Sequence, residues 1–330
     1  MSGAKSGWRF GSRSDADEVV AGHDLSDRTL IVTGANTGIG FETARALASA
    51  GARVILACRQ TATGQAAVDR IRALHPNARA EAMHLDLASF ASIRAFVERL
   101  DAPVIDALVC NAGLAVTRYE ETAEGFEKTL GVCHIGHFLL TRLLMPRLLA
   151  APQPRLVVVS SESHRMPPRL DFARLPMTAG NFRGLVAYGQ AKLCNVLFAK
   201  ALQRRYGARG LVACALHPGT LVTTDIGRYS GVFAVLMKLV SPFTKTPSQG
   251  AATSVEALVH EPASELAGVY LSHCRPVACT AEADDPAVAD RLWALSEDWV
   301  ASAAAPPWPA DETPAPEPVP ATPTTEGPAA

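Results

Sequence analysis

The stretch that most constrains this chain is residues 29–40, which read T-L-I-V-T-G-A-N-T-G-I-G. The apolar and β-branched residues 30–33 predict a short buried parallel strand, and residues 41–50 have the composition of a helix. Between them, three glycines predict a tight turn: Gly34, Gly38 and Gly40. A helix N-terminus behind such a turn binds anions, because its free N–H groups and positive dipole end face the turn. The stretch therefore favours dinucleotide binding over an ordinary glycine-rich turn.

Strand and helix patterns alternate along the rest of the chain. Further strands are predicted at 53–57, 80–85, 106–110, 155–160, 211–216 and 268–271. Helices are predicted at 63–74, 89–100, 123–149, 188–206 and 249–260. This alternation predicts an α/β fold with a single doubly wound parallel sheet flanked by helices, whose ligand lies beyond the carboxyl ends of the strands.

Composition excludes several classes of protein. The 330 residues are 48% hydrophobic with a net charge of −1, which is typical of a globular protein and gives no electrostatic case for a nucleic-acid partner. Seven cysteines without C-x-x-C spacing are interpreted as reduced core residues of a cytoplasmic protein, with no metal site. No apolar run is long enough to span a bilayer, and the polar, charged first 25 residues are not expected to be a secretory signal.

Composition also divides the chain. The polar residues 1–25 predict a mobile N-terminal arm. Residues 26–303 form the predicted catalytic domain. Residues 304–330 consist almost wholly of Pro, Ala, Thr and Glu and predict a disordered tail, because they offer too little apolar surface to order themselves.

The end of the second predicted strand indicates the cofactor. An acidic side chain there would bind the ribose hydroxyls of NAD, but the chain reads Ala57-Cys58-Arg59. No carboxylate is present to repel a 2′-phosphate, and the guanidinium of Arg59 can bind one. The alternative is a solvated arginine at a strand end. We expect NADP(H).

Tyr188 and Lys192 lie four residues apart, which on a helix places phenol and ammonium on one face. A phenol with its reference pKa of about 10 is a poor base at neutral pH, and a neighbouring ammonium favours the phenolate. Such a pair is often only a surface helix feature. Ser161, at the end of an upstream parallel strand where this kind of sheet binds its ligand, favours a catalytic interpretation.

Several motifs together resemble the short-chain dehydrogenase/reductase family, in its retinol dehydrogenase and WW-domain oxidoreductase-like branch. They are Thr33-Gly34-x-x-x-Gly38-Ile39-Gly40, Asn111-Ala112-Gly113, Tyr188-x-x-x-Lys192 and His217-Pro218-Gly219 with Thr223. V-C-H-I-G-H-F-L-L-T and S-P-F-x-K-x-x-x-Q-G-A add to the likeness. The resemblance covers about residues 27 to 302 and implies a Rossmann-type sheet and an NADP(H)-dependent oxidoreductase that interconverts a carbonyl and an alcohol.

The resemblance also implies roles for single residues. Ser161 would hydrogen-bond the substrate oxygen, Tyr188 would transfer the proton, and Lys192 would hold the nicotinamide ribose and tune Tyr188; Ser160 is the less favoured serine. The implied cofactor contacts are Gly34, Asn36, Thr37, Gly38, Ile39, Gly40, Arg59, Asp86, Leu87, Asn111, Ala112, Gly113, Tyr188, Lys192, Pro218, Gly219 and Thr223.

Cys133 departs from the family pattern, which has an asparagine that completes a Ser-Tyr-Lys-Asn tetrad and helps to hold a relay water. Two alternatives to the carbonyl chemistry therefore stay open. One is a cofactor-binding sensor or interaction protein with impaired catalysis. The other is a C=C reductase that resembles the protochlorophyllide reductases.

Two segments are expected to cover the substrate: a proline-rich loop at 162–186 and a lid at 225–247. Residues 232–240 read V-F-A-V-L-M-K-L-V and favour a lid over an apolar, retinoid-like or otherwise lipophilic substrate, with an interfacial anchor as the alternative. Contact with a membrane surface is thus allowed but not required. The family resemblance suggests a monomer or a homodimer.

Overall fold

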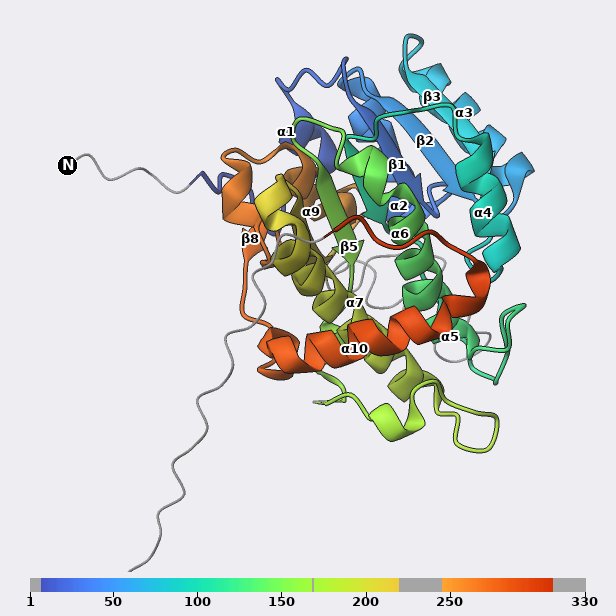
Figure 1. Ribbon diagram of the computed structural model, residues 1–330. Helices are drawn as coiled ribbons and strands as arrows, with labels where there is room; N and C mark the ends of the chain where they lie inside the picture. The colour runs from blue at the N-terminus through green and yellow to red at the C-terminus, as the bar shows by residue number, and fades with distance from the viewer. Residues whose placement is uncertain (1–6, 168, 220–244, 311–330) are drawn as a thin grey trace, which may run out of the picture.

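The computed structural model describes residues 7–167, 169–219 and 245–310, which form an α/β domain (Figure 1). Its strands are β1 Thr29–Thr33, β2 Arg53–Cys58, β3 Arg79–His84, β4 Ala107–Cys110, β5 Arg155–Val159, β6 Val212–His217, β7 Tyr270–Ser272 and β8 Arg275–Pro276. They lie in one sheet in the order β3-β2-β1-β4-β5-β6-β7-β8, and only the β7–β8 pair is antiparallel. The predicted doubly wound sheet is confirmed. From β1 the chain first adds β2 and β3 on one side of the sheet and then β4, β5 and β6 on the other. This switch point between the parallel strands β1 and β4 is where such sheets bind ligands.

Helices cover both faces of the sheet, as Figure 1 shows. They are α1 Ala16–Val20, α2 Gly38–Ser49, α3 Thr61–Leu74, α4 Phe90–Arg99, α5 Lys128–Leu130, α6 Gly136–Leu148, α7 Gly184–Tyr206, α9 Pro247–Val259 and α10 Pro286–Trp299. Buried residues of α1, α2, α3 and α9 share one apolar core, and those of α4, α6, α7 and α10 share the other. Among the described helices none combines the length and apolar character needed to cross a membrane.

The central strands β4 and β5 are apolar or buried throughout because both of their faces are covered. In β5, Leu156 and Val158 join the core under α6 and α7, whereas Val157 and Val159 join the core under α2 and α9. Continuous apolar runs of this kind are typical of central parallel strands. The polar residues that follow each strand are thereby left at the carboxyl edge of the sheet.

The helical region predicted from residue 123 begins later and is not uniform. It starts with α5 at Lys128, continues as a π-helical turn over Gly131–Ile135, and becomes regular only in α6. Glu127 caps its start by accepting hydrogen bonds from the backbone N–H groups of Thr129 and Leu130. The π-helical turn contains Cys133, and such turns are frequent at functional sites.

Residues 7–25 differ from the mobile arm that was expected for residues 1–25. Asp15 caps α1, and Ala16 and Val19 of that helix are fully buried in the core that includes α9. The Trp8 ring stacks on His260 with 3.8 Å between ring centroids. A five-residue helix is too short to give a periodic pattern, which is why the sequence did not reveal it. Residues 1–6 lie outside the described part of the chain.

The start of the expected disordered tail is likewise ordered. We call residues 301–310 the C-terminal strap; it crosses α6 in front of the sheet (Figure 1). Arg142 donates hydrogen bonds to the carbonyls of Ala305 and Pro306, and the Trp308 ring packs 4.7 Å from that of Trp293. The prediction is therefore wrong for residues 304–310, because one tryptophan supplies the apolar contact that the composition lacks. Residues 311–330 lie outside the described ranges.

Candidate active site

The glycine turn between β1 and α2 requires its glycines. Gly34 and Gly38 have φ values of +65° and +59°, in the left-handed region that favours glycine. A Cβ atom on Gly40 would lie 2.4 Å from Asn111 Nδ2 and 2.5 Å from the Gly34 carbonyl oxygen. The turn is therefore tight enough for the backbone to approach a ligand closely, and the first turn of α2 contains no acidic residue that would repel an anion.

A buried network ties this turn to β4. Thr33 Oγ1 accepts the backbone N–H groups of Asn111 and Ala112, each at 2.9 Å, and Asn111 Nδ2 donates to the Thr33 carbonyl at 2.8 Å. The Thr33 hydroxyl also lies 2.9 Å from His137 Nε2, whose Nδ1 lies 3.1 Å from the Cys133 carbonyl. Because a carbonyl only accepts, Nδ1 carries the proton, and Nε2 is left as an acceptor towards the Thr33 hydroxyl, which also donates to the Val109 carbonyl at 3.3 Å. Burial lowers the pKa of His137 to about 4 and keeps the ring neutral.

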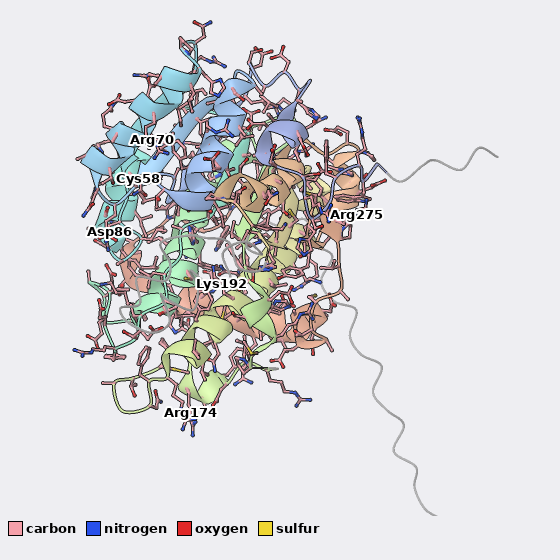
Figure 2. The ribbon with its side chains drawn as sticks, turned by 180° about the vertical axis from the view of Figure 1, so that it is seen from behind. Cys58, Arg70, Asp86, Arg174, Lys192 and Arg275 are labelled. Atoms are coloured by element: carbon pink, nitrogen blue, oxygen red, sulfur yellow. The ribbon has the colours of Figure 1, made fainter. Side chains whose placement is uncertain are left out.

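The adenosine end of the predicted site lies beyond β2 and β3. Arg59 follows β2, is exposed, and has no ion-pair partner among the described residues. Asn36 Nδ2 donates to Thr63 Oγ1 at 3.3 Å, and Asp86 Oδ1 accepts the Ala88 N–H at 2.9 Å. Figure 2 shows Cys58 and Asp86 on the same side of the molecule, away from Lys192. Leu87 is buried, and its carbonyl oxygen would lie 2.4 Å from a Cβ on Gly136.

The three predicted catalytic residues come from β5 and α7. Ser161 directly follows β5, and its Oγ accepts the Ser163 N–H at 3.2 Å and caps a 3-10 turn. Tyr188 is half-buried and Lys192 is only 3% exposed, one turn further along α7. Lys192 Nζ donates to the Val159 carbonyl at 3.0 Å and lies 5.5 Å from the centroid of the Tyr188 ring. Lys192 thus places a buried positive charge between the end of β5 and Tyr188.

Two further contacts fix α7 against the end of β5. Ser160 Oγ donates a hydrogen bond to the Lys192 carbonyl at 2.7 Å. The Ser160 hydroxyl is therefore already used in a buried contact with α7. A Cβ atom on Gly189 would lie 1.7 Å from the Met166 carbonyl oxygen, so only glycine allows the loop after Ser161 to pack on α7. The glycine that follows Tyr188 is therefore a packing requirement of the site.

Cys133, Gly113 and Lys192 meet at the carboxyl end of β4. A Cβ atom on Gly113 would lie 3.2 Å from Lys192 Nζ and 3.5 Å from Cys133 Sγ. The thiol donates a hydrogen bond to the Leu114 carbonyl, with Sγ and O 3.6 Å apart. Burial raises the pKa of Cys133, and nearby Lys192 opposes this only in part, so the group is a neutral thiol.

The last predicted motif follows β6. His217 is buried, and Gly219 has a φ of +120° that favours glycine. The Cδ atom of Lys245 would lie 2.5 Å from a Cβ on Gly219. Thr223 and residues 225–244 of the expected lid lie outside the described part of the chain.

A cleft of about 570 Å³ lies at the other edge of the sheet and does not contain these groups. It is lined by residues at the amino ends of the strands, among them Arg28, Arg53, Asp106 and Gln153. Two of its charged groups already have partners: Arg53 pairs with Glu81, and Asp106 accepts the Thr29 N–H. We therefore place the candidate site at the carboxyl edge.

Comparison with known proteins agrees with this geometry. The sequence model described as short chain dehydrogenase matches residues 28–173. WW domain-containing oxidoreductase of Danio rerio is 43% identical over 307 residues, which cover 91% of this chain and 74% of that protein. The chain belongs to the short-chain dehydrogenase family. Human retinol dehydrogenase 12 is 41% identical over 274 residues, which cover 82% of this chain and 86% of that protein, and supports the retinol dehydrogenase-like branch.

A solved structure also resembles this chain. It is assigned as an NAD(P)-dependent gluconate 5-dehydrogenase of Beutenbergia cavernae with NADP bound at low occupancy. It has a TM-score of 0.60 and 27% identity, and the match covers 75% of this chain and 95% of that chain. A nicotinamide dinucleotide is the cofactor of this family. The tight glycine turn and the uncapped, non-acidic first turn of α2 fit its phosphates.

Not all of the site was visible in the sequence. His137 received no role there, although a histidine four residues after Cys133 in a buried helical region is the signal that could have revealed it. Lys245 lies in the S-P-F-x-K-x-x-x-Q-G-A stretch that resembles the family. Its contact with Gly219, 26 residues earlier in the chain, is encoded by no local pattern.

Proposed function

We propose that this member of the family is an NADP(H)-dependent oxidoreductase that interconverts a carbonyl and an alcohol on an apolar substrate. The observation that carries the proposal is the placement of Tyr188 and Lys192 one helical turn apart on α7, with Ser161 on the adjoining end of β5. The bound nicotinamide supplies the hydride. The protein supplies positioning and proton transfer.

In the direction of reduction, the Ser161 hydroxyl donates a hydrogen bond to the carbonyl oxygen of the substrate. The Tyr188 phenol gives its proton to that oxygen while the carbon receives the hydride, so that an alcohol forms. The buried Lys192 ammonium favours the resulting phenolate, which takes a proton from solvent. Oxidation of an alcohol reverses each transfer.

The preference for NADP(H) rests on the end of β2. Arg59 is exposed, and no described carboxylate is paired with it. A guanidinium in this place can bind a 2′-phosphate through two parallel hydrogen bonds, whereas the acidic residue that selects NAD is absent. The NADP-bound relative from Beutenbergia cavernae supports the same choice.

The apolar substrate is supported by the loop after Ser161 and by the relatives. Met166 is 67% exposed and Leu185 is 83% exposed, and both belong to the segment 162–186 that is expected to cover the substrate. Exposed apolar side chains beside a site suit a lipophilic ligand. The name of the retinol dehydrogenase relative points to the same class of substrate.

A second candidate is a cofactor-binding sensor with impaired catalysis, and Cys133 is the observation that favours it. Its thiol stands beside Gly113 and Lys192 where the family has an amide, and its hydrogen bond goes to the Leu114 carbonyl. A backbone carbonyl can hold the relay water whatever side chain stands at position 133, so the proton relay does not require an asparagine there. We therefore favour the active enzyme over the sensor.

The test is NADPH oxidation with a panel of aliphatic, aromatic and retinoid aldehydes and ketones, together with NADPH binding followed by its fluorescence. We expect turnover of at least one lipophilic aldehyde and a kcat/KM at least about tenfold higher with NADPH than with NADH. Binding without turnover across the panel would favour the sensor. Turnover that depends on light would favour a C=C reductase, and a preference for NADH would contradict the role of Arg59.

The cellular setting is part of the proposal. All seven cysteines are free in the structure and six of them are buried, and we propose that they are reduced core residues. We propose a cytoplasmic protein that acts on a small molecule as a monomer or homodimer.

A further inference from the structure

Two large apolar side chains are exposed beside the candidate active site. Met166, in the loop after β5, is 67% exposed, and Leu185, in the first turn of α7, is 83% exposed. The Met166 carbonyl oxygen would lie only 1.7 Å from a Cβ on Gly189, and Gly189 lies one turn after Leu185 on α7. The two side chains therefore belong to neighbouring parts of one surface, next to Tyr188.

Exposed arginines accompany this apolar pair. Arg169 is 88% exposed, and its Nε atom lies 3.9 Å from Glu282. Arg174 is 65% exposed, and its Nε atom lies 3.6 Å from Asp171. Arg183 is exposed directly before α7 and forms no ion pair with another described residue. Exposed ion pairs of this length contribute little, so the guanidinium groups remain available to a partner. We call this set the loop surface: Met166, Arg169, Arg174, Arg183 and Leu185.

An aromatic pair lies at the edge of the loop surface. Phe182 packs edge-to-face on Tyr119, with 5.9 Å between the ring centroids, and both side chains are partly exposed. A Cβ on Gly184 would lie 2.6 Å from the Val116 carbonyl oxygen, so this second segment is held against the start of α7. It also contains Arg118, which is exposed and has no carboxylate partner among the described residues. Aromatic and cationic side chains around apolar ones are typical of surfaces at the boundary between a bilayer and water.

Charge is unevenly divided between this loop and the rest of the chain. The segment 162–186 contains four arginines and two carboxylates and thus carries +2, whereas the whole chain carries −1, which leaves −3 for the remainder. Two carboxylates nearby are already paired: Glu162 lies 2.7 Å from Arg165, and Glu120 lies 2.6 Å from Lys128. The loop therefore attracts an anionic partner that the remainder of the molecule repels.

We propose that the loop surface docks the protein reversibly on an anionic lipid bilayer. Met166 and Leu185 enter the lipid and leave water, while the guanidinium groups bind the phosphate oxygens of the headgroups. Two apolar side chains offer little area, so docking depends on the anionic charge of the lipid and weakens in salt. A protein partner is disfavoured, because two separate apolar side chains do not form the packed apolar centre of a protein interface.

Docking of this kind lies beyond the proposed carbonyl chemistry. It brings the part of the molecule that contains Tyr188 to the bilayer. An apolar substrate dissolved in the lipid then need not cross water to reach the phenol.

The test is binding of the full-length protein to vesicles, followed by cosedimentation in the absence of cofactor and substrate. Vesicles of equal parts phosphatidylcholine and phosphatidylserine are compared with vesicles of phosphatidylcholine alone, at low and at high salt. The loop variants are Leu185→Gln and the double variant Arg169→Gln/Arg174→Gln. Because all three side chains are exposed, these variants should fold like the wild type.

Two variants serve as matched controls. Leu74→Gln changes a leucine that is 63% exposed, one turn after Arg70 on α3. Figure 2 shows Arg70 and Arg174 at opposite ends of the molecule. Arg204→Gln/Arg205→Gln removes the same charge as the double loop variant, but from the far end of α7, where both arginines form ion pairs.

We expect the wild type to bind the mixed vesicles at least about tenfold more tightly than phosphatidylcholine alone, and high salt to remove most of this difference. Arg169→Gln/Arg174→Gln should reduce the affinity on the order of tenfold and Leu185→Gln about fivefold, whereas both controls should stay within about twofold of the wild type.

Equal binding to both kinds of vesicle, or no binding at all, would overturn the inference. Binding that both loop variants retain would overturn it too, because the protein would then dock by another face. An equal loss in the controls would show that net charge alone decides. A wild type that ignores vesicles and forms a dimer which Leu185→Gln dissociates would assign the surface to a second copy of the chain. Since no cofactor or substrate is present, a failure of the proposed function would leave all of these outcomes unchanged.

Discussion

At the scale of single residues, the site depends on buried groups that hydrogen-bond while neutral. His137 joins the hydroxyl of Thr33 to the carbonyl of Cys133 and thereby connects the glycine turn with the π-helical turn. His134 lies beside it, fully enclosed, with Nε2 2.8 Å from Ser296 Oγ. Burial lowers the pKa of His134 to about 3 and that of His137 to about 4. Neither ring can take up a proton in the folded state near neutral pH.

These histidines predict a loss of stability in mild acid. Above pH 6.5, the ordinary pKa of histidine, both states carry neutral rings. Below it the unfolded chain binds protons that the native state cannot bind, so the free energy of unfolding falls as the pH falls towards 4. Between pH 6.5 and pH 5, each of the two rings should lower the free energy of unfolding by about 2 kcal/mol.

Urea unfolding across this pH range measures the effect. His137→Asn removes one titrating group, so its stability should fall less steeply with acid than that of the wild type, whatever its stability at pH 7. Equal slopes for the two proteins would show that His137 is protonated in the folded state.

At the scale of elements, the C-terminal strap holds α6 and α7 from outside. Its backbone carbonyls accept hydrogen bonds from Arg142 on α6 and from Tyr206 at the end of α7. Trp308 places its ring between those of Trp293 and Phe138, at 4.7 and 5.3 Å between centroids. Because α6 continues the turn that contains Cys133, and α7 carries Tyr188 and Lys192, the strap supports the helices that carry the proposed catalytic residues.

Removing the indole tests this support. Trp308→Ala should lower the free energy of unfolding by about 2–3 kcal/mol, somewhat less than for a fully buried tryptophan because Trp308 is only partly buried. Leu185→Ala is the control: this leucine is 83% exposed, and its loss should cost less than about 0.5 kcal/mol. Similar stabilities of the two variants in chemical denaturation would mean that the strap is not part of the folded core.

At the scale of the whole molecule, the sequence predicted what local periodicity and spacing encode. The strands from Thr29 to Leu271 and the pairing of Tyr188 with Lys192 on one helix follow from patterns a few residues long. The packing of Trp8 on His260 and of Trp308 on Trp293 does not, because Trp8 and Trp308 lie in segments without a periodic apolar pattern and the two rings of each pair are brought together by the tertiary fold. Lys245 over Gly219 is of the same kind. Tertiary contact there overrides local composition.

The central claim is that Tyr188 is the proton donor beside a bound nicotinamide dinucleotide. The most direct test is Tyr188→Phe, which removes one hydroxyl from a half-buried ring and keeps its packing. NADPH affinity and turnover of the best aldehyde in the panel would be measured on the same preparation. We predict a turnover reduced on the order of 1000-fold with an NADPH dissociation constant within about twofold of the wild type. Turnover within tenfold of the wild type at unchanged NADPH affinity would contradict the claim.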